Sequence, residues 1–262
     1  MTAQVDGPAQ ALARANRFIA AHAPGGFVEP IADGVTVVAS TVPIAIANGV
    51  QVSSPDIHAD VLERALQRAS AISTPWSVQV TGHAPTPDEL ALTGSRSMRM
   101  TRFPTLSASL ASAAADSALP VTEAQLRRVD AESDREGFVG VIAAAFGMNT
   151  AAGAAYVAPS MLAAAGARTY VAALDGEVVS AGFTTLDEEG WLALFAIGTI
   201  PAARRRGISR ALTTLMLRDG RAEGAHTAVL QASSMAEPLY VELGFTDSGD
   251  DTVYFMEPAG SR

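Results

Sequence analysis

The sequence of 262 residues contains no cysteine and no lysine. Without cysteine, the chain cannot form disulfides, thiolate metal sites or a cysteine nucleophile, so a route through an acyl-cysteine is excluded. Aromatic residues make up 6% and charged residues 17% of the chain, and every side chain that is cationic at neutral pH is an arginine. The absence of cysteine is typical of a protein that stays in the cytoplasm, which is the location we expect.

Long apolar runs and targeting signals are also absent. The segment most similar to a membrane span, residues 141–167, is mostly alanine and glycine with polar interruptions, so we expect no membrane association. The N-terminal residues lack the basic and then apolar pattern of a signal peptide. The formal net charge is −9, whereas proteins that bind nucleic acids usually present a basic surface. We therefore expect no nucleic-acid partner.

Common metal and nucleotide motifs are missing too. The four histidines are scattered along the chain and none has a spacing such as HExxH, so we expect no metal. The chain has neither the GxxxxGK[ST] pattern of a P-loop nor the GxGxxG pattern of a Rossmann fold. Each histidine is better explained as a structural or surface residue.

The order of apolar patterns predicts a mixture of helices and strands. In the C-terminal part we expect strands at 125–131, 169–174, 178–186, 191–200, 227–231 and 253–256, the last closing the sheet. We expect helices at 133–146, 152–165 and 207–222, and a short one ending at 243–244. Antiparallel hairpins followed by a strand–helix–strand unit indicate the α+β class. Residues 106–119 are small and almost uncharged, which predicts a division into domains at 1–117 and 118–262.

The first half resembles a diverged copy of the second. When the chain is shifted by 150 residues, several patterns align: Ile44–Val50 with Leu194–Ile200, Trp76–Val80 with His226–Leu230, and Leu62 and Leu66 with Leu212 and Met216. Such a match without gaps indicates an internal duplication. Identities are few, so two unrelated but similar α/β patterns remain an alternative.

A basic cluster follows the strand expected at 191–200. Pro201 ends that strand, and three arginines and Gly207 precede the next helix. The first turn of a helix has unpaired N–H groups and the positive end of the dipole, and glycine lets a phosphate approach the backbone. Ser209 is small and adds a hydroxyl donor. The pattern predicts a phosphate or diphosphate site, the alternative being a solvated basic turn.

Two motifs resemble the GNAT superfamily of N-acetyltransferases. Arg204-x-x-Gly207-x-Ser209 is similar to the family pattern [Q/R]-x-x-G-x-[G/A], with serine at the last small position. Further along, Leu239-Tyr240-Val241-Glu242-Leu243-Gly244-Phe245 matches the family motif L-Y-x-x-L-G-F, although Pro238 falls inside the expected helix. The family's usual asparagine is replaced by Ser233. By these motifs, residues 120–258 are identified as a GNAT member.

This resemblance implies a GNAT-like acyl-CoA N-acyltransferase fold, with two tandem GNAT-like domains of which 1–117 is degenerate and non-catalytic and 118–262 is catalytic. It implies direct transfer of an acetyl group from acetyl-CoA to a primary amine of a small molecule, an amino acid or a peptide. Tyr240 would protonate the departing thiolate. The implied cofactor-binding residues are Ile197, Gly198, Thr199, Arg204, Arg205, Arg206, Gly207, Ile208, Ser209, Arg210 and Ser233.

Other roles stay open. Candidates for the base are Asp187, Glu188, Glu189 and Glu237, each also explained as a solvated turn or helix residue. A non-catalytic acyl-CoA-binding or regulatory module and a phosphate-binding domain unrelated to CoA are the alternatives to an enzyme. The sequence is compatible with an oligomer as well as a monomer. In the N-terminal copy, Ser54, Pro55, Asp56 and Ile57 replace residues 204–207 and Leu90 replaces Tyr240, which excludes the same site there.

Overall fold

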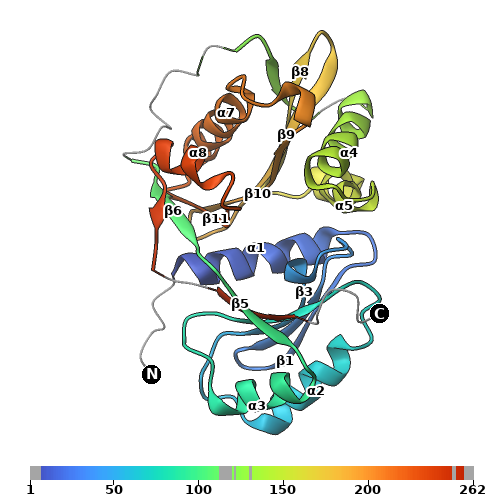
Figure 1. Ribbon diagram of the computed structural model, residues 1–262, viewed down its shortest axis with the longest axis vertical. Helices are drawn as coiled ribbons and strands as arrows, with labels where there is room; N and C mark the ends of the chain where they lie inside the picture. Colours follow the sequence, from blue (N-terminus) through green and yellow to red (C-terminus); the bar gives the residue numbers. More distant parts are fainter. Residues whose placement is uncertain (1–6, 112–119, 121, 130–131, 250–251, 257–262) are drawn as a thin grey trace. The chain divides into compact units, whose positions relative to one another are not determined.

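The computed structural model describes residues 7–111, 120, 122–129, 132–249 and 252–256. The chain forms two compact units: unit 1 comprises Met1–Thr105 and Asp247–Arg262, and unit 2 comprises Leu106–Thr246. Each unit contains one mixed β-sheet with helices on its faces (Figure 1). None of the helices in the described ranges is long and apolar enough to cross a membrane.

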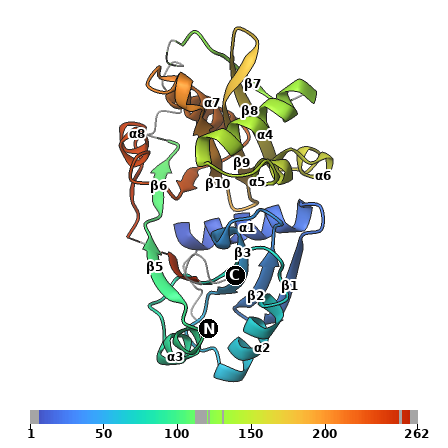
Figure 2. The ribbon, with the colours of Figure 1, turned by 45° about the vertical axis from the view of Figure 1, so that its right-hand side comes forward.

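Unit 1 contains a six-stranded sheet with the order β1-β2-β3-β4-β13-β5. Its elements are α1 (Pro8–His22), β1 (Phe27–Ala32), β2 (Val35–Ala39), η1 (Ala45–Ala47), β3 (Asn48–Val52), α2 (Ala59–Ala69), β4 (Ser77–Val80), α3 (Pro87–Ser95), β5 (Arg99–Phe103) and β13 (Thr252–Met256). Only β3 and β4 run parallel, and the other neighbouring pairs are antiparallel. Helix α1 lies on one face of the sheet and α2 on the other (Figure 2).

The core of unit 1 lies between its sheet and α2. Helix α2 buries its apolar residues at a spacing of three and four, including Leu62 and Leu66, which is the pattern of an amphipathic helix. These side chains belong to one buried cluster with Val50 and Val78 of the central strands. On the opposite face, the Gln51 amide donates a hydrogen bond to the Ala13 carbonyl of α1 (3.1 Å).

Unit 2 contains a seven-stranded sheet with the order β12-β6-β11-β10-β9-β8-β7. Its elements are β6 (Leu106–Ser109), β7 (Gln125–Arg128), α4 (Glu132–Phe146), α5 (Ala151–Ala154), η3 (Ala155–Val157), α6 (Pro159–Leu162), β8 (Ala167–Leu174), β9 (Glu177–Leu186), β10 (Trp191–Thr199), η4 (Pro201–Ala203), α7 (Ile208–Ala222), β11 (Thr227–Leu230), α8 (Glu237–Glu242) and β12 (Thr246–Asp247). Strands β10 and β11 are parallel, as in the corresponding pair of unit 1.

Helices α4 and α7 pack on opposite faces of the unit 2 sheet (Figure 1). Helix α7 approaches β9 closely because Gly182 has no side chain; a Cβ atom there would lie 2.8 Å from the Met216 sulfur. Leu212 and Met216 are fully buried in the resulting core. The helix at 208–222 and its apolar face agree with the sequence prediction.

One predicted helix is interrupted. Residues 152–165 form two short α-helical turns, α5 and α6, separated by the 3₁₀ turn η3. Ala158 is extended, with φ −60° and ψ 145°, because the proline that follows disfavours a helical conformation at the preceding residue. The strand predicted at 125–131 ends at Arg128, and residues 130–131 of that range lie outside the described residues.

Each sheet contains one strand from the other half of the chain. Strand β6 pairs with β11, although residues 106–109 were predicted to be part of a linker. Strand β13 lies between β4 and β5, with Val253 opposite Val80 and Arg102. The prediction that 253–256 closes the C-terminal sheet was therefore wrong. The division predicted after residue 117 falls within 112–119, outside the described residues, and the chain passes from unit 1 to unit 2 and back.

The exchange is reciprocal, because both strands occupy the same place in their sheets. β13 is inserted between β4 and β5, and β6 is inserted between β11 and β12. Two sheets that share a strand order and an inserted partner strand are expected from a duplicated and fused domain. Each half of the sequence thus completes the sheet of the other.

Because β13 completes unit 1, a C-terminal substitution should destabilise the N-terminal unit. Val253 is 2% exposed within the unit 1 core, and we expect Val253→Ala to lower the free energy of unfolding of unit 1 by about 2 kcal/mol. The chain has one tryptophan in each unit, Trp76 and Trp191, so urea titrations of the two single-tryptophan variants monitor the units separately. The exposed Val241→Ala is the matched control. A shift reported only by Trp191 would contradict the strand exchange.

Candidate functional site

The two parallel strands at the centre of unit 2 separate part of the way along. Strand β11 pairs with β10 only from Trp191 to Ala193, whereas β9 follows β10 as far as Thr199. Among the described strands, none pairs with the second half of β10 on its β11 side. This edge presents backbone N–H and C=O groups that can pair with an extended ligand.

A β-bulge interrupts β10 where the strands separate. The register with β9 shifts between Phe195 and Gly198, and Ala196 adopts φ +51°. A left-handed conformation is costly for a residue with a side chain, and such strain is concentrated at functional sites. The bulge re-aims the backbone of the three residues that follow, Ile197, Gly198 and Thr199.

Contacts around Gly198 fix the end of β10. A Cβ atom at Gly198 would lie 2.8 Å from the Ala145 Cβ, so the glycine lets the last turn of α4 pack against the strand. The buried Ser180 hydroxyl donates to the Gly198 carbonyl (2.8 Å) and lies 2.9 Å from the Thr199 hydroxyl oxygen. One acceptor position of the Gly198 carbonyl is therefore occupied within the protein.

The segment between β10 and α7, residues 204–207, forms a strained turn that we call the arginine turn. Arg205 and Gly207 are both left-handed, with φ +61° and +73°. Gly207 is the N-cap of α7; no side chain caps this helix, and its first turn closes by the Ala211 N–H donating to the Gly207 carbonyl (3.0 Å). A Cβ atom at Gly207 would meet no atom within 4 Å. The first N–H groups of α7 thus open onto space that an anion can occupy.

The four arginines of this region have different partners. Arg204 donates to the carbonyls of Thr199 (3.1 Å) and Ala145 (3.2 Å), so it joins the ends of β10 and α4. Arg206 pairs with Glu123, and Arg210 pairs with Glu242 at 2.6 Å. Arg205 is exposed and forms no ion pair with any residue that the structure describes. The guanidinium of Arg204 is therefore structural, and that of Arg205 is available to a ligand.

A cavity of about 380 Å³ lies beside the start of α7. Its lining residues are Thr122, Glu123, Leu174, Arg206 and Ile208. The Ile208 side chain is buried in the core of unit 2, so among the predicted residues it contributes its backbone N–H rather than its side chain.

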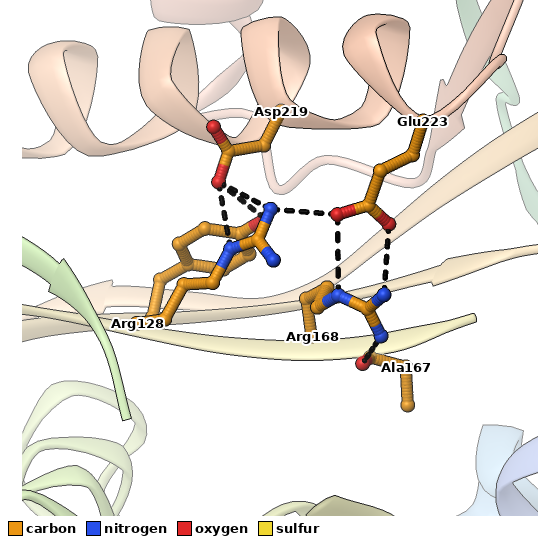
Figure 3. A network of polar contacts seen from close by, with 6 residues as sticks. Arg128, Ala167, Arg168, Asp219 and Glu223 are labelled. Carbon is orange, nitrogen blue, oxygen red and sulfur yellow. Dashed lines mark hydrogen bonds and ion pairs between the residues drawn. The ribbon is translucent and has the colours of Figure 1, made fainter. Parts of the chain in front are cut away.

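The other end of α7 is anchored by a network of ion pairs (Figure 3). Arg128 of β7 binds Asp219 (2.8 Å) and Glu223 (2.6 Å), and Arg168 of β8 binds Glu223 (3.1 Å). The Tyr170 hydroxyl also donates to Asp219 (3.2 Å). This network attaches the C-terminal turn of α7 to two strands, which fixes the direction in which its N-terminus points.

Tyr240 lies in α8 and is 6% exposed. Its ring makes an edge contact with Phe245 (5.8 Å between centroids) and belongs to the same buried cluster as Ile208 and Leu212. Burial raises the pKa of the Tyr240 hydroxyl above its usual value, so the group stays protonated at neutral pH. Pro238 occupies the first turn of α8, where no N–H is required, and therefore does not break the helix.

Other predicted residues lie apart from this cluster. Ser233 is exposed, and its carbonyl accepts hydrogen bonds from the N–H groups of Ala236 and Glu237. Asp187 accepts from the Trp191 N–H (2.8 Å) in the turn before β10, at the opposite end of the strand from Thr199. The same turn contains Glu188 and Glu189. In the described ranges, no three His, Cys, Asp or Glu side chains gather to hold a metal ion.

Unit 1 lacks the features that form this site. Strands β3 and β4 stay paired to Val52 and Val80, and the Thr81 N–H continues the ladder to the Val52 carbonyl (3.0 Å). Between β3 and α2, where every residue is described, no residue has a positive φ. The corresponding edge of unit 1 is closed.

The structural comparisons agree with this geometry. A GCN5-related N-acetyltransferase from Kribbella flavida superposes with a TM-score of 0.66 at 15% identity, covering 97% of this chain and 96% of that one. A GCN5-related N-acetyltransferase from Sphaerobacter thermophilus gives a TM-score of 0.57 at 16% identity, covering 86% of this chain and 76% of that one. Both identities are low, so the similarity establishes the fold: two mixed sheets with helices, as in two GNAT-like domains.

The sequence comparisons concern the second half of the chain. A mycothiol acetyltransferase from Streptomyces avermitilis is 33% identical over 92 residues, which are 34% of this chain and 30% of that protein. The alignment therefore spans less than a third of that relative. The family model for the GNAT acetyltransferase domain matches residues 132–255, which include the bulged strand, the arginine turn and Tyr240. Residues 132–255 thus form an acetyltransferase domain of the GNAT family.

Proposed function

We propose that this protein is an acetyl-CoA-dependent N-acetyltransferase that acts on a primary amine of a small molecule, an amino acid or a peptide. The observation that supports this most is the continuity of the open edge of β10 with the arginine turn and the uncapped start of α7. A thioester with a pantetheine arm and a diphosphate has the matching sequence of groups. The match of residues 132–255 to a GNAT domain supports the same assignment.

In this proposal, the backbone of Ile197, Gly198 and Thr199 pairs with the amides of the pantetheine arm, in the manner of an added strand. The diphosphate binds to the N–H groups from Arg205 to Arg210, with the Arg205 guanidinium adding a charge-assisted bond. Arg204 supports the site by holding the end of β10, and Ser233 is assigned to the rim of the arm's path.

The reaction is a direct transfer. The neutral amine attacks the thioester carbon, a C–N bond forms, and the C–S bond breaks as the tetrahedral intermediate collapses. The nitrogen releases its proton to water or to a carboxylate, and the Tyr240 hydroxyl donates a proton to the CoA thiolate and regains one from solvent. Of the four candidate carboxylates, Glu237 shares α8 with Tyr240, whereas Asp187 and its neighbours lie at the far end of β10.

Unit 1 is assigned a non-catalytic role. Its closed strand pair and the Asp56 and Ile57 side chains at the equivalent turn leave no place for a diphosphate. The catalytic role is thereby confined to unit 2.

The proposal is tested by measuring CoA release from acetyl-CoA with a panel of primary amines, including amino acids, polyamines and short peptides. We expect at least one amine to accelerate release in the intact protein, with acetylated product confirmed by mass spectrometry. Tight binding of acetyl-CoA without turnover on any amine would instead support a non-catalytic acyl-CoA-binding module. Absence of binding would contradict both assignments.

The pH profile follows from the raised pKa of Tyr240. The acceptor must lose a proton before it attacks, so kcat/KM should rise with pH until the amine is neutral. Because burial raises the pKa of Tyr240 above its ordinary value of about 10, the acid stays protonated over the rest of the range. We therefore expect a plateau that extends to about pH 9.5. A descending limb near neutral pH that disappears in Tyr240→Phe would contradict this assignment.

A further inference from the structure

Two carboxylates face arginines at the start of α7. An Arg206 Nη atom pairs with Glu123, and Arg210 Nη1 lies 2.6 Å from a Glu242 oxygen. Glu123 lies just before β7, 83 residues away in sequence from Arg206, and Glu242 is the last residue of α8. The fold thus brings negative charge from two distant segments to a place where an anion is expected to bind.

These ion pairs contribute little to the fold. The side chains are exposed by 45% for Arg206 and 81% for Glu123, and by 43% for Arg210 and 60% for Glu242. An exposed pair of this kind changes a folding equilibrium by at most about fivefold. The structural contacts of this region are instead those of Arg204, which binds two backbone carbonyls. Stability therefore does not explain the two carboxylates.

Their effect on a bound diphosphate is larger, because it has two parts. A guanidinium presents the same fork of N–H groups to a carboxylate and to a phosphate, so Glu123 competes with the ligand for Arg206. Each carboxylate also lies next to an arginine at the start of α7, well within a Debye length of about 8 Å, and repels an anion there. Glu123 lines the cavity beside this turn together with Arg206, so its charge faces open space.

We infer that Glu123 and Glu242 are counter-ions that lower the affinity of the α7 start for the diphosphate and thereby speed the release of the CoA product. This inference rests on the proposed function, because it concerns the same diphosphate site. Both carboxylates act through an arginine, so they are positioning residues. The consequence is specific in sign: removing either negative charge strengthens CoA binding, whereas loss of a structural contact weakens it.

The test uses the full chain with Glu123→Gln, Glu242→Gln and the double substitution. The Kd of CoA is measured by calorimetry, and the KM of acetyl-CoA and product inhibition by CoA are measured kinetically. We expect each single change to lower the Kd by about threefold and the double change by about tenfold, with no increase in kcat. In 1 M salt, where the Debye length is about 3 Å, the differences should largely disappear.

Two variants serve as controls. Glu123→Asp keeps the charge and should keep the Kd near that of the unaltered protein. Glu132→Gln removes an equally exposed carboxylate from an ion pair with Arg135 on α4 and should leave CoA binding unchanged. If the unaltered protein binds CoA but the single changes leave the Kd unchanged or raise it, the inference fails and the proposed function stands. If the unaltered protein does not bind CoA, both fail.

Discussion

Replacing Tyr240 with phenylalanine should lower kcat by about 100-fold while leaving the Kd of acetyl-CoA unchanged. The substitution removes the proton that the departing thiolate needs, and a positioned general acid commonly contributes a factor of this size or more. The ring can stay in place, because its edge contact with Phe245 involves no hydroxyl. No described residue forms a hydrogen bond with the Tyr240 hydroxyl, so no buried partner is left unsatisfied.

A matched control is available in the same unit. Tyr170 is also buried, and its hydroxyl donates to Asp219 at the distant end of α7 (3.2 Å). Tyr170→Phe should lower stability by about 1 kcal/mol through the lost hydrogen bond, with kcat close to that of the unaltered protein. Equal kcat values for Tyr240→Phe and the unaltered protein would remove Tyr240 from the chemistry.

Gly207→Asp should raise the Kd of acetyl-CoA by about 100-fold, or about 2.7 kcal/mol. The glycine is left-handed and a side chain would enter empty space, which is where we place the diphosphate. A carboxylate there would both occupy that space and repel the anion. Aspartate tolerates the left-handed conformation better than most residues, so the fold should persist.

Gly224 provides the control for backbone strain. It lies just after the other end of α7, has φ +105°, and a Cβ atom there would also meet nothing within 4 Å. Gly224→Asp therefore carries a similar conformational cost and the same added charge at a distance from the arginine turn. We expect a comparable loss of stability in both variants by chemical denaturation, but weaker binding only in Gly207→Asp. Equal effects on binding would mean that strain, and not occupation of the site, is responsible.

Local patterns were enough to predict most of unit 2. The helix at 208–222 and the three strands before it agree with the predicted ranges to within two residues. These elements are specified by their own periodicity and by turn residues such as Gly176 and Pro201, which act over a few positions. The arginine turn was placed correctly between strand and helix for the same reason.

The strand exchange could not be predicted from local pattern. The apolar residues of β6 and β13 fit an interior strand of either sheet, and pattern alone does not say which sheet each one joins. Register in the structure supplies that information, because Ser109 faces Thr227 and Val253 faces Val80. A comparison over long sequence separations would be needed to see it.

The internal comparison at a shift of 150 residues was correct only in part. Gly49 lies opposite Ser77 in unit 1, and Trp191 lies opposite Thr227 in unit 2, so the first strands of the two pairs are offset by 142 residues. The predicted alignment of 44–50 with 194–200 is therefore wrong: residues 45–47 form η1, and β3 begins at Asn48. The additional residues of unit 2 form the bulge and open end of β10, which are the features that distinguish the two units.

The most direct test is the stoichiometry of acetyl-CoA binding, measured by calorimetry on the full chain. We predict one site per chain, lost or strongly weakened in Gly207→Asp and unaffected by Gly224→Asp or by Asp56→Asn in unit 1. Two sites per chain, no binding, or one site that is insensitive to Gly207→Asp would contradict the assignment of the acetyl-CoA site to β10 and the start of α7.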